Sequence, residues 1–323
     1  MRRQQILAAR EFISRMEAAG VLNDFGDGSS INISTISPVI RFCESTAEHR
    51  IFCYGKFFQR VPTTNRVGRQ LRALVYDTGQ VFPILMGMFE LASGTYTLGC
   101  RDEYLGWGEP SKRAIKERGL RRIMDLASVV ALPPYNLLFG GKLMAALALS
   151  DTVRREYERR YKSALLGLVA TSATGLHCAI LNRIGLKPGG LYRRIGATTG
   201  YSTLFISPHT LSEARRFLPR FTSAPEGEFS VSVRPLHVLR TALRSCGIAP
   251  DRILRSAYPK GVYFGTISDK HIVALREGRT VTGPGLPLDA IVDYWRDRYL
   301  AKAVADHRRV ADFLAHRRCG PIS

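Results

Sequence analysis

Two adjacent glycines and a lysine form the clearest chemical pattern in the sequence. Gly140-Gly141-Lys142 follows a valine-rich apolar run that ends at Pro133-Pro134, and a segment of high helix propensity begins at Leu143. Glycines let backbone N–H groups approach a phosphate, and a helix N-terminus adds a partial positive charge. We therefore predict a phosphate-binding turn at Gly140 and Gly141, with Lys142 beside it. The alternative is that both glycines only allow a strand and a helix to pack closely.

Asp102 is the residue that we predict for acid–base chemistry outside this turn. Together with Arg101 it precedes the aromatic residues Tyr104 and Trp107, where either charged side chain can line a cleft. The alternative is an exposed charge beside an aromatic anchor, which is the usual structural arrangement.

Spacing excludes two other kinds of site. His177 and Cys178 are neighbours, and neighbouring side chains on a helix point about 100° apart, so they do not form a nucleophile–base pair. The six cysteines are scattered, with no C-x-x-C pair and no histidine at metal-ligand spacing beside them. We predict no metal site.

The net charge indicates a polyanionic partner. The chain has 47 Lys and Arg residues against 27 Asp and Glu residues, a formal net charge of +20 that exceeds what solubility requires. Most of the excess lies beyond residue 100, where adjacent arginine pairs recur, and arginine suits forked contacts with phosphate oxygens. A solvated, arginine-rich surface is the alternative for any single pair. We predict nucleic acid as the partner, with these contact residues: Arg121, Arg122, Arg193, Arg194, Lys260, Tyr263, Arg296 and Arg298.

The last part of the chain interleaves aromatic residues with cations, a mixture that stacks on bases and neutralises phosphates. Ile291, Trp295 and Tyr299 nevertheless recur every four residues, as on the buried face of an amphipathic helix. We therefore predict that Trp295 packs in the core and that some of the arginines contact phosphate.

The apolar pattern predicts an α/β fold. Residues 71–77 and 81–91 have the pattern of two strands joined by a tight turn. Further buried strands are predicted at 123–132 and 165–171, separated by helices at 143–149 and 151–162. A helix over 176–184 and a turn at 185–190 follow. Beyond residue 207 the sequence predicts helices at 211–217, 235–246 and 251–257, a strand at 262–265, and a long helical stretch over 288–318.

We divide the chain into three parts. Residues 1–65 form a small helical cap and connector, residues 66–210 the central α/β domain, and residues 211–323 a basic, mostly helical region. Charges interrupt the apolar residues of the first 20 positions, and no apolar run reaches the length of a membrane span. We therefore predict a cytoplasmic protein that does not contact a membrane.

The order of a strand ending in proline, a glycine turn and a helix resembles the core of the GNAT acyltransferases, where this turn holds the pyrophosphate of coenzyme A. The resemblance implies a GNAT-like mixed central sheet flanked by helices, with acyl-coenzyme A as the cofactor. The residues that it places at the coenzyme are Tyr135, Asn136, Gly140, Gly141 and Lys142. Tyr135 and Leu138 depart from the residue types that the superfamily prefers at these places.

The same resemblance assigns a role to Tyr192. The sequence Leu191-Tyr192-Arg193-Arg194-Ile195-Gly196 resembles the segment where these acyltransferases often place a general-acid tyrosine, which protonates a leaving thiolate. The alternative for Tyr192 is a core tyrosine with one satisfied hydroxyl.

A longer, collinear set of residues resembles the DruA family of the Druantia anti-phage systems, which also occurs beside mobile elements. The matching segments are Arg101-Asp102, Leu105-Gly106-Trp107, Pro133-Pro134-Tyr135-Asn136, Gly140-Gly141-Lys142-Leu143, Ala170-Thr171, Leu191–Gly196, Thr199-Gly200-Tyr201, Lys260-Gly261-Val262-Tyr263 and Trp295-Arg296-Asp297-Arg298-Tyr299. They cover roughly residues 66–300. The resemblance implies a role in defence or mobile-element biology, with DNA rather than RNA as the nucleic acid and other defence proteins as partners.

Two hypotheses of function follow. The first is a nucleic-acid-binding defence protein that modifies DNA by acyl transfer. The alternative is a DNA-binding or adaptor module that retains a degenerate GNAT fold without catalysis. An acyltransferase for proteins or small molecules leaves the charge of +20 unexplained.

Overall fold

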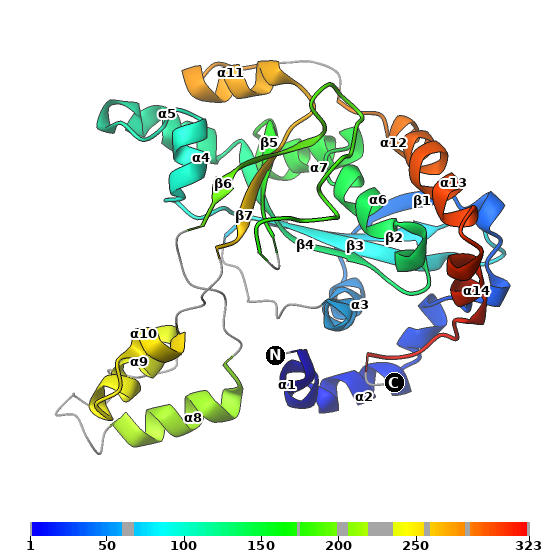
Figure 1. The fold of residues 1–323 in the computed structure, drawn as a ribbon, viewed down its shortest axis with the longest axis horizontal. Coiled ribbons are helices and arrows are strands. Elements are labelled where there is room, and N and C mark those ends of the chain that lie inside the picture. Colours follow the sequence, from blue (N-terminus) through cyan, green and yellow to red (C-terminus); the bar gives the residue numbers. More distant parts are fainter. Residues whose placement is uncertain are drawn as a thin grey trace.

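A seven-stranded mixed sheet forms the centre of the protein (Figure 1). The computed structural model describes residues 2–59, 68–172, 175–198, 206–218, 235–254, 259–281 and 285–321. The strand order is β1-β2-β3-β4-β5-β7-β6, and all neighbours are antiparallel except β4 and β5, which are parallel. The strands are β1 (Pro38–Phe42), β2 (Gln70–Asp77), β3 (Ile84–Ala92), β4 (Ile123–Ala131), β5 (Gly167–Thr171), β6 (Tyr192–Ala197) and β7 (Gly261–Gly265).

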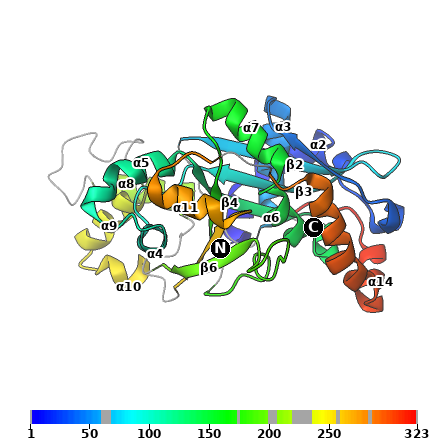
Figure 2. The same cartoon turned by 90° about the horizontal axis from the view of Figure 1, so that it is seen from above.

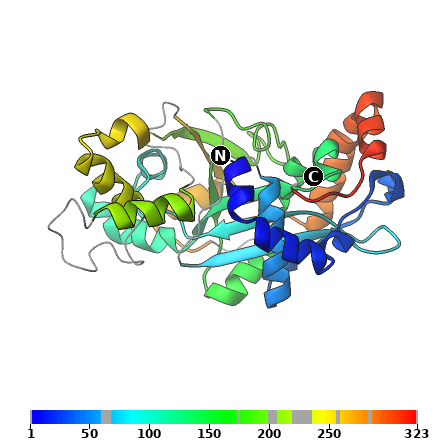
Figure 3. The ribbon, with the colours of Figure 1, turned by 90° about the horizontal axis from the view of Figure 1, so that it is seen from below.

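Helices cover both faces of the sheet (Figures 1 and 3), which confirms the predicted α/β class with a mixed sheet flanked by helices. One face packs against α6 (Gly140–Leu147), α7 (Asp151–Tyr161), α12 (Leu288–Trp295) and α13 (Ala301–Val304). The other face packs against α2 (Arg10–Ala18) and α3 (Thr46–Gly55), with α1 (Arg2–Ala8) beside them. A third apolar cluster joins β5, β6 and β7 to α4 (Gly99–Tyr104), α5 (Arg113–Leu120) and α11 (Asp269–Glu277).

The remaining helices lie at two extremities. The helices α8 (Pro208–Phe217), α9 (Pro235–Ser245) and α10 (Pro250–Leu254) pack on one another and stand apart from the sheet in Figure 1. At the opposite end, α14 (His307–Ala315) contacts the single turn Gly28–Ser30 (Figure 2). None of the helices among the described residues has the length and apolar character needed to cross a bilayer.

Most of the elements expected from the apolar pattern are present, but the helix expected over residues 176–184 is wrong. This segment forms consecutive turns, and Arg183 adopts a left-handed backbone conformation with φ of 62°, which a right-handed helix does not tolerate. The long helix expected over residues 288–318 is also interrupted. A π-helical turn, Arg296–Leu300, follows α12, and Asp306 caps a separate α14.

The three-part division of the chain stays a prediction, although its outer parts contribute to the central sheet. β1 comes from the predicted N-terminal cap and pairs with β2, while β7 comes from the predicted helical region and lies between β5 and β6. The boundary at residue 65 and the segment Thr199-Gly200-Tyr201 lie outside the described residues.

The single parallel pair positions the candidate site. β4 pairs with β5 only over Ile123–Asp125, so the two strands part and the rest of β4 has no strand on that side within the described part of the chain. A parallel connection needs a crossover, and α6 and α7 supply it. The N-terminus of α6 therefore lies near the carboxyl end of β4, beside the gap.

His271 makes the stability of the fold depend on pH. The imidazole is 6% exposed, Nδ1 lies 3.2 Å from the Leu166 carbonyl oxygen, and burial lowers the pKa of His271 from its ordinary value of 6.5. The unfolded chain therefore binds a proton more readily, and stability contributed by neutral His271 is complete above about pH 6.5 and declines below it.

We expect the free energy of unfolding of wild type to fall between pH 8 and pH 5 more steeply than that of His271→Asn. Urea titrations at several pH values measure the difference, and exposed His209→Asn is the control. Parallel curves for wild type and His271→Asn contradict this assignment.

Candidate functional site

A cavity of about 390 Å³ lies where β4 and β5 part. The carboxyl end of β4 and the start of α6 form two of its walls. Phe58 and Gln59, which follow α3, and the turns after β5 form the others. The residues that line it are Phe58, Gln59, Val129, Val130, Ala131, Asn136, Phe139, Gly141, Lys142, Ala179 and Ile180. Most of them are apolar, so the cavity suits a flexible, largely apolar chain with a polar end.

The two glycines at the start of α6 have different surroundings. A Cβ on Gly140 would lie 2.7 Å from the Tyr135 carbonyl oxygen, so this glycine allows close packing, as the alternative hypothesis states. A Cβ on Gly141 would lie 3.3 Å from the side chain of Ile180, and both residues line the cavity. Phe139 precedes both in the left-handed conformation, with φ of 57°, and turns the chain into the helix. Gly141 is therefore the glycine that borders the cavity.

Lys142 lines the cavity, but its ammonium is already bonded. Nζ donates to the carbonyl oxygens of Ala179 at 2.7 Å and Asn182 at 2.6 Å, and it lies 5.1 Å from the centre of the Tyr299 ring. Burial, and more weakly the charge of Arg183, lowers the pKa of Lys142. The lysine thus ties α6 to the turns after β5, and a bound phosphate would share an ammonium that two carbonyls already hold.

The side chains of Tyr135 and Asn136, which follow β4, lie in different surroundings. Asn136 lines the cavity, whereas Tyr135 is completely buried and donates its hydroxyl to Asp77 Oδ2 at 2.9 Å. Burial and the Asp77 carboxylate raise the pKa of Tyr135. Tyr135 therefore anchors the segment after β4 to the β2–β3 turn and does not border the cavity.

Tyr192 occupies the core as the packing alternative describes. Its side chain is 5% exposed, and the hydroxyl donates to the Ala145 carbonyl oxygen of α6 at 2.7 Å. Burial raises the pKa of Tyr192. A general acid must release its proton at the reacting atoms, and this hydroxyl is directed at a helix backbone instead.

Asp102 is held in a buried ion cluster. Oδ1 accepts from Arg101 at 2.6 Å and 2.9 Å, and Oδ2 accepts from Lys116 Nζ at 2.9 Å. Arg101 is fully buried and also donates to the carbonyl oxygens of Thr95 and Tyr96. Asp102 does not line the cavity at β4, so the geometry gives it a stabilising role.

The wall opposite α6 contains polar residues that the sequence analysis did not identify. Gln59 lines the cavity and donates its side-chain amide to the buried Ser128 hydroxyl on β4. Ser128 faces Glu90 across the β3–β4 pair, and Glu90 accepts from Lys56 Nζ at 2.7 Å and Arg72 Nε at 3.0 Å. No spacing in one sequence links these residues, because they meet only in the folded sheet.

The predicted nucleic-acid contacts lie in separate parts of the fold. Arg193 and Arg194 are exposed near the start of the edge strand β6, whereas Lys260 bonds to Thr198, just beyond the end of that strand. The side chain of Arg121 is exposed before β4, whereas Arg122 donates to the Arg279 carbonyl oxygen.

The C-terminal candidates differ in exposure. Tyr263 is 1% exposed, and its hydroxyl accepts from the backbone N–H of Cys178, so it is not available to stack on a base. Arg296 donates to the Ile36 carbonyl oxygen at 2.7 Å, and Arg298 is exposed. Trp295 is 1% exposed, which confirms the prediction that it packs.

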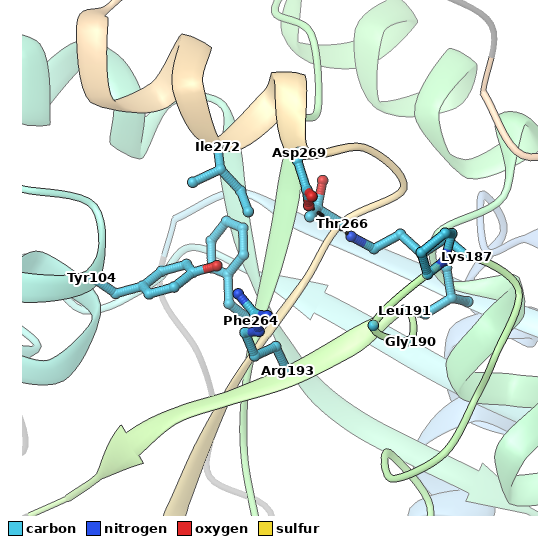
Figure 4. A pocket seen from close by; sticks show the side chains of 11 residues that line it. Tyr104, Lys187, Gly190, Leu191, Arg193, Phe264, Thr266, Asp269 and Ile272 are labelled. Atoms are coloured by element: carbon cyan, nitrogen blue, oxygen red, sulfur yellow. Dashed lines mark hydrogen bonds and ion pairs between the residues drawn. The ribbon is translucent and has the colours of Figure 1, made fainter.

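A smaller cavity of about 30 Å³ lies beside β6 (Figure 4). Arg193 lines it, and Lys187 reaches across to Asp269 at 3.0 Å. Lys187, and more weakly Arg193, lowers the pKa of the Asp269 carboxyl. The volume is about that of one water molecule, so this cavity does not hold a substrate. Among the described residues, no cluster of three or more His, Cys, Asp or Glu is placed to bind a metal ion.

Comparisons with known proteins identify one family. The family model described as "Druantia protein DruA" matches residues 2–264. A curated protein named Druantia protein DruA, from Escherichia coli strain UMEA 4076-1, is 27% identical over 294 residues, which is 86% of this chain and 70% of the relative. No solved structure matches the chain.

The ion cluster at Asp102 gives a stability prediction. Replacing Asp102 by Ala leaves Arg101 and Lys116 buried without their carboxylate, and we expect a loss of about 3–5 kcal/mol in the free energy of unfolding. Urea unfolding measures this loss, with the exposed neighbour Glu103→Ala as the control. If the Asp102→Ala protein is as stable as the control, Asp102 does not have the stabilising role assigned to it.

Proposed function

This chain belongs to the DruA family, and from that membership and its geometry we propose that it is a nucleic-acid-binding component of anti-phage defence whose cavity takes an acyl donor. We place it in the cytoplasm, with DNA as the nucleic acid and other defence proteins as partners. The proposal depends chiefly on the cavity at the parting of β4 and β5.

The lining of the cavity fits part of an acyl-coenzyme A molecule. The first backbone N–H groups of α6 have no partner further back in the helix and attract negative charge, and Gly141, at the second position of α6, lines the cavity without a side chain. The apolar side chains of Val129, Ala131 and Ile180 suit the uncharged arm of the coenzyme. When bound, the coenzyme supplies an activated thioester, while the residues of this chain hold it and exclude water.

The net charge of +20 supports nucleic acid as the second ligand. Arg193 and Arg194 project from an edge strand, and no carboxylate forms an ion pair with either of them among the residues that the structure describes. When exposed guanidinium groups bind a phosphate backbone, they release its counterions, and this release increases the affinity for nucleic acid.

A second function, binding without catalysis, is favoured by three hydrogen bonds. Lys142 Nζ and the Tyr192 hydroxyl are both committed to backbone carbonyl oxygens, so neither group is free to act on a substrate. Under this alternative the protein delivers partner proteins to DNA, and its cavity has no donor.

Titration with coenzyme A and acetyl-coenzyme A, followed by calorimetry, separates the two functions. We expect saturable binding by wild type, weakened on the order of tenfold or more in Gly141→Leu, because the new side chain crowds Ile180 and takes up volume of the cavity that both residues line. Gly99→Leu is the matched control, since Gly99 also begins a helix and nothing lies within 4 Å of its Cβ position. Absence of binding by wild type would favour the non-catalytic alternative.

A further inference from the structure

A groove separate from the β4 cavity lies beside the segment between β5 and β6. Its volume is about 640 Å³, and it opens between the Arg183–Gly190 segment and the π-helical turn. The residues that line it are Arg183, Gly185, Gly189, Gly190, Tyr192, Tyr294 and Arg298. None of these positions carries a carboxylate, and two of them carry guanidinium groups.

Both arginines of the groove are exposed. Within the described residues, neither Arg183 nor Arg298 forms an ion pair, although many other arginines of the chain do. Of the acidic residues nearby, Asp297 adjoins Arg298 but does not line the groove, Asp293 pairs with Arg296, and Asp269 pairs with Lys187. Two unpaired cations that converge on one hollow attract an anion strongly.

Four backbone irregularities lie in the walls of the groove. Arg183 has φ of 62°, which is unfavourable for a residue with a side chain, and Gly189 and Gly190 have φ of 78° and 81°. Arg298 lies on a single π-helical turn, a feature that is frequent at functional sites. Strained backbone persists where the surroundings fix it.

Two tyrosines supply those surroundings. Tyr294 accepts a hydrogen bond from the Gly185 backbone N–H at 2.7 Å, and Tyr299 donates to the Arg183 carbonyl oxygen. The rings of the two tyrosines meet edge to face, 5.8 Å apart. The segment that bears Arg183 is therefore fixed to the helix that bears Arg298, and the two guanidinium groups are presented from a rigid frame.

We propose that this groove binds the phosphodiester backbone of nucleic acid, with Arg183 and Arg298 each contacting a phosphate oxygen. The inference depends on the proposed function and names the surface that performs it. The groove is open, and Tyr192 in its lining directly precedes the exposed Arg193 and Arg194 of the edge strand. Gly189 has nothing within 4 Å of its Cβ position and leaves room for close approach.

The test removes both charges without disturbing the frame. Asn replaces Arg183 because Asn tolerates the left-handed conformation, and Gln replaces Arg298. The matched control, Arg15→Gln with Arg155→Gln, removes two charges that are each 72% exposed elsewhere on the surface. Binding of a mixed-sequence DNA duplex is followed by fluorescence anisotropy between 50 and 300 mM NaCl, concentrations chosen to resolve counterion release, which is about 0.9 per phosphate contact.

We expect the slope of log affinity against log salt to fall by about 2 in the Arg183→Asn/Arg298→Gln protein and to stay at the wild-type value in the control. If wild type binds DNA and both variants have the same slope of log affinity against log salt, the assignment of the groove is wrong and the proposed function still stands. No binding by wild type overturns the function itself. A parallel titration with coenzyme A tests whether the groove binds a small phosphorylated ligand instead. If the double variant loses affinity for coenzyme A and keeps its affinity for DNA, the assignment of the groove to nucleic acid is wrong.

Discussion

The parting of β4 from β5 is the constraint on which the candidate site depends. Three residues of β4 pair in parallel with β5, and beyond Asp125 no strand among the described residues pairs with β4 on that side. A strand edge without a partner exposes backbone polar groups, which water or a ligand must satisfy. The crossover that a parallel pair requires brings the start of α6 to the same place, so the cavity, the unpaired strand and the helix N-terminus arise together from one feature of the sheet.

Buried charges stabilise the elements around this gap. Glu90 joins Lys56 and Arg72 on the α3 face of the sheet, and Asp102 joins Arg101 and Lys116 between α4 and α5. Such clusters contribute little net stability over apolar packing, but loss of one member leaves an unpaired buried charge and is strongly destabilising. They therefore fix the geometry of α3 and α4. Asp102, which the sequence offered as a catalytic residue, belongs to this class.

The sequence predicted helices and strands well where the apolar residues followed one clear pattern. It predicted them poorly where contacts with distant parts of the chain determine the local structure. The β2–β3 hairpin, β4 and α7 follow from alternation, apolar runs and helix propensity. Residues 176–184 have a helical composition, yet the Tyr263 hydroxyl, the Lys142 ammonium and the Tyr299 hydroxyl each bond to this segment and hold it in turns. Gly141 was predicted at the site from local pattern and Asn136 from the resemblance to the acyltransferases, whereas Gln59 and Ile180 reach the cavity only through tertiary packing.

The segment between β5 and β6 connects the two hollow regions of the molecule. Its first part, at Ala179 and Ile180, forms a wall of the β4 cavity, and its second part, from Arg183 to Gly190, forms a wall of the arginine groove. Lys142 bonds to carbonyl oxygens at Ala179 and Asn182, and the charge of Arg183 contributes to lowering the pKa of that lysine. The same segment is held by Lys142 on the side of the cavity and by Tyr294 and Tyr299 on the side of the groove. The two hollows therefore depend on one set of contacts, because a change in the conformation of this segment alters a wall of each.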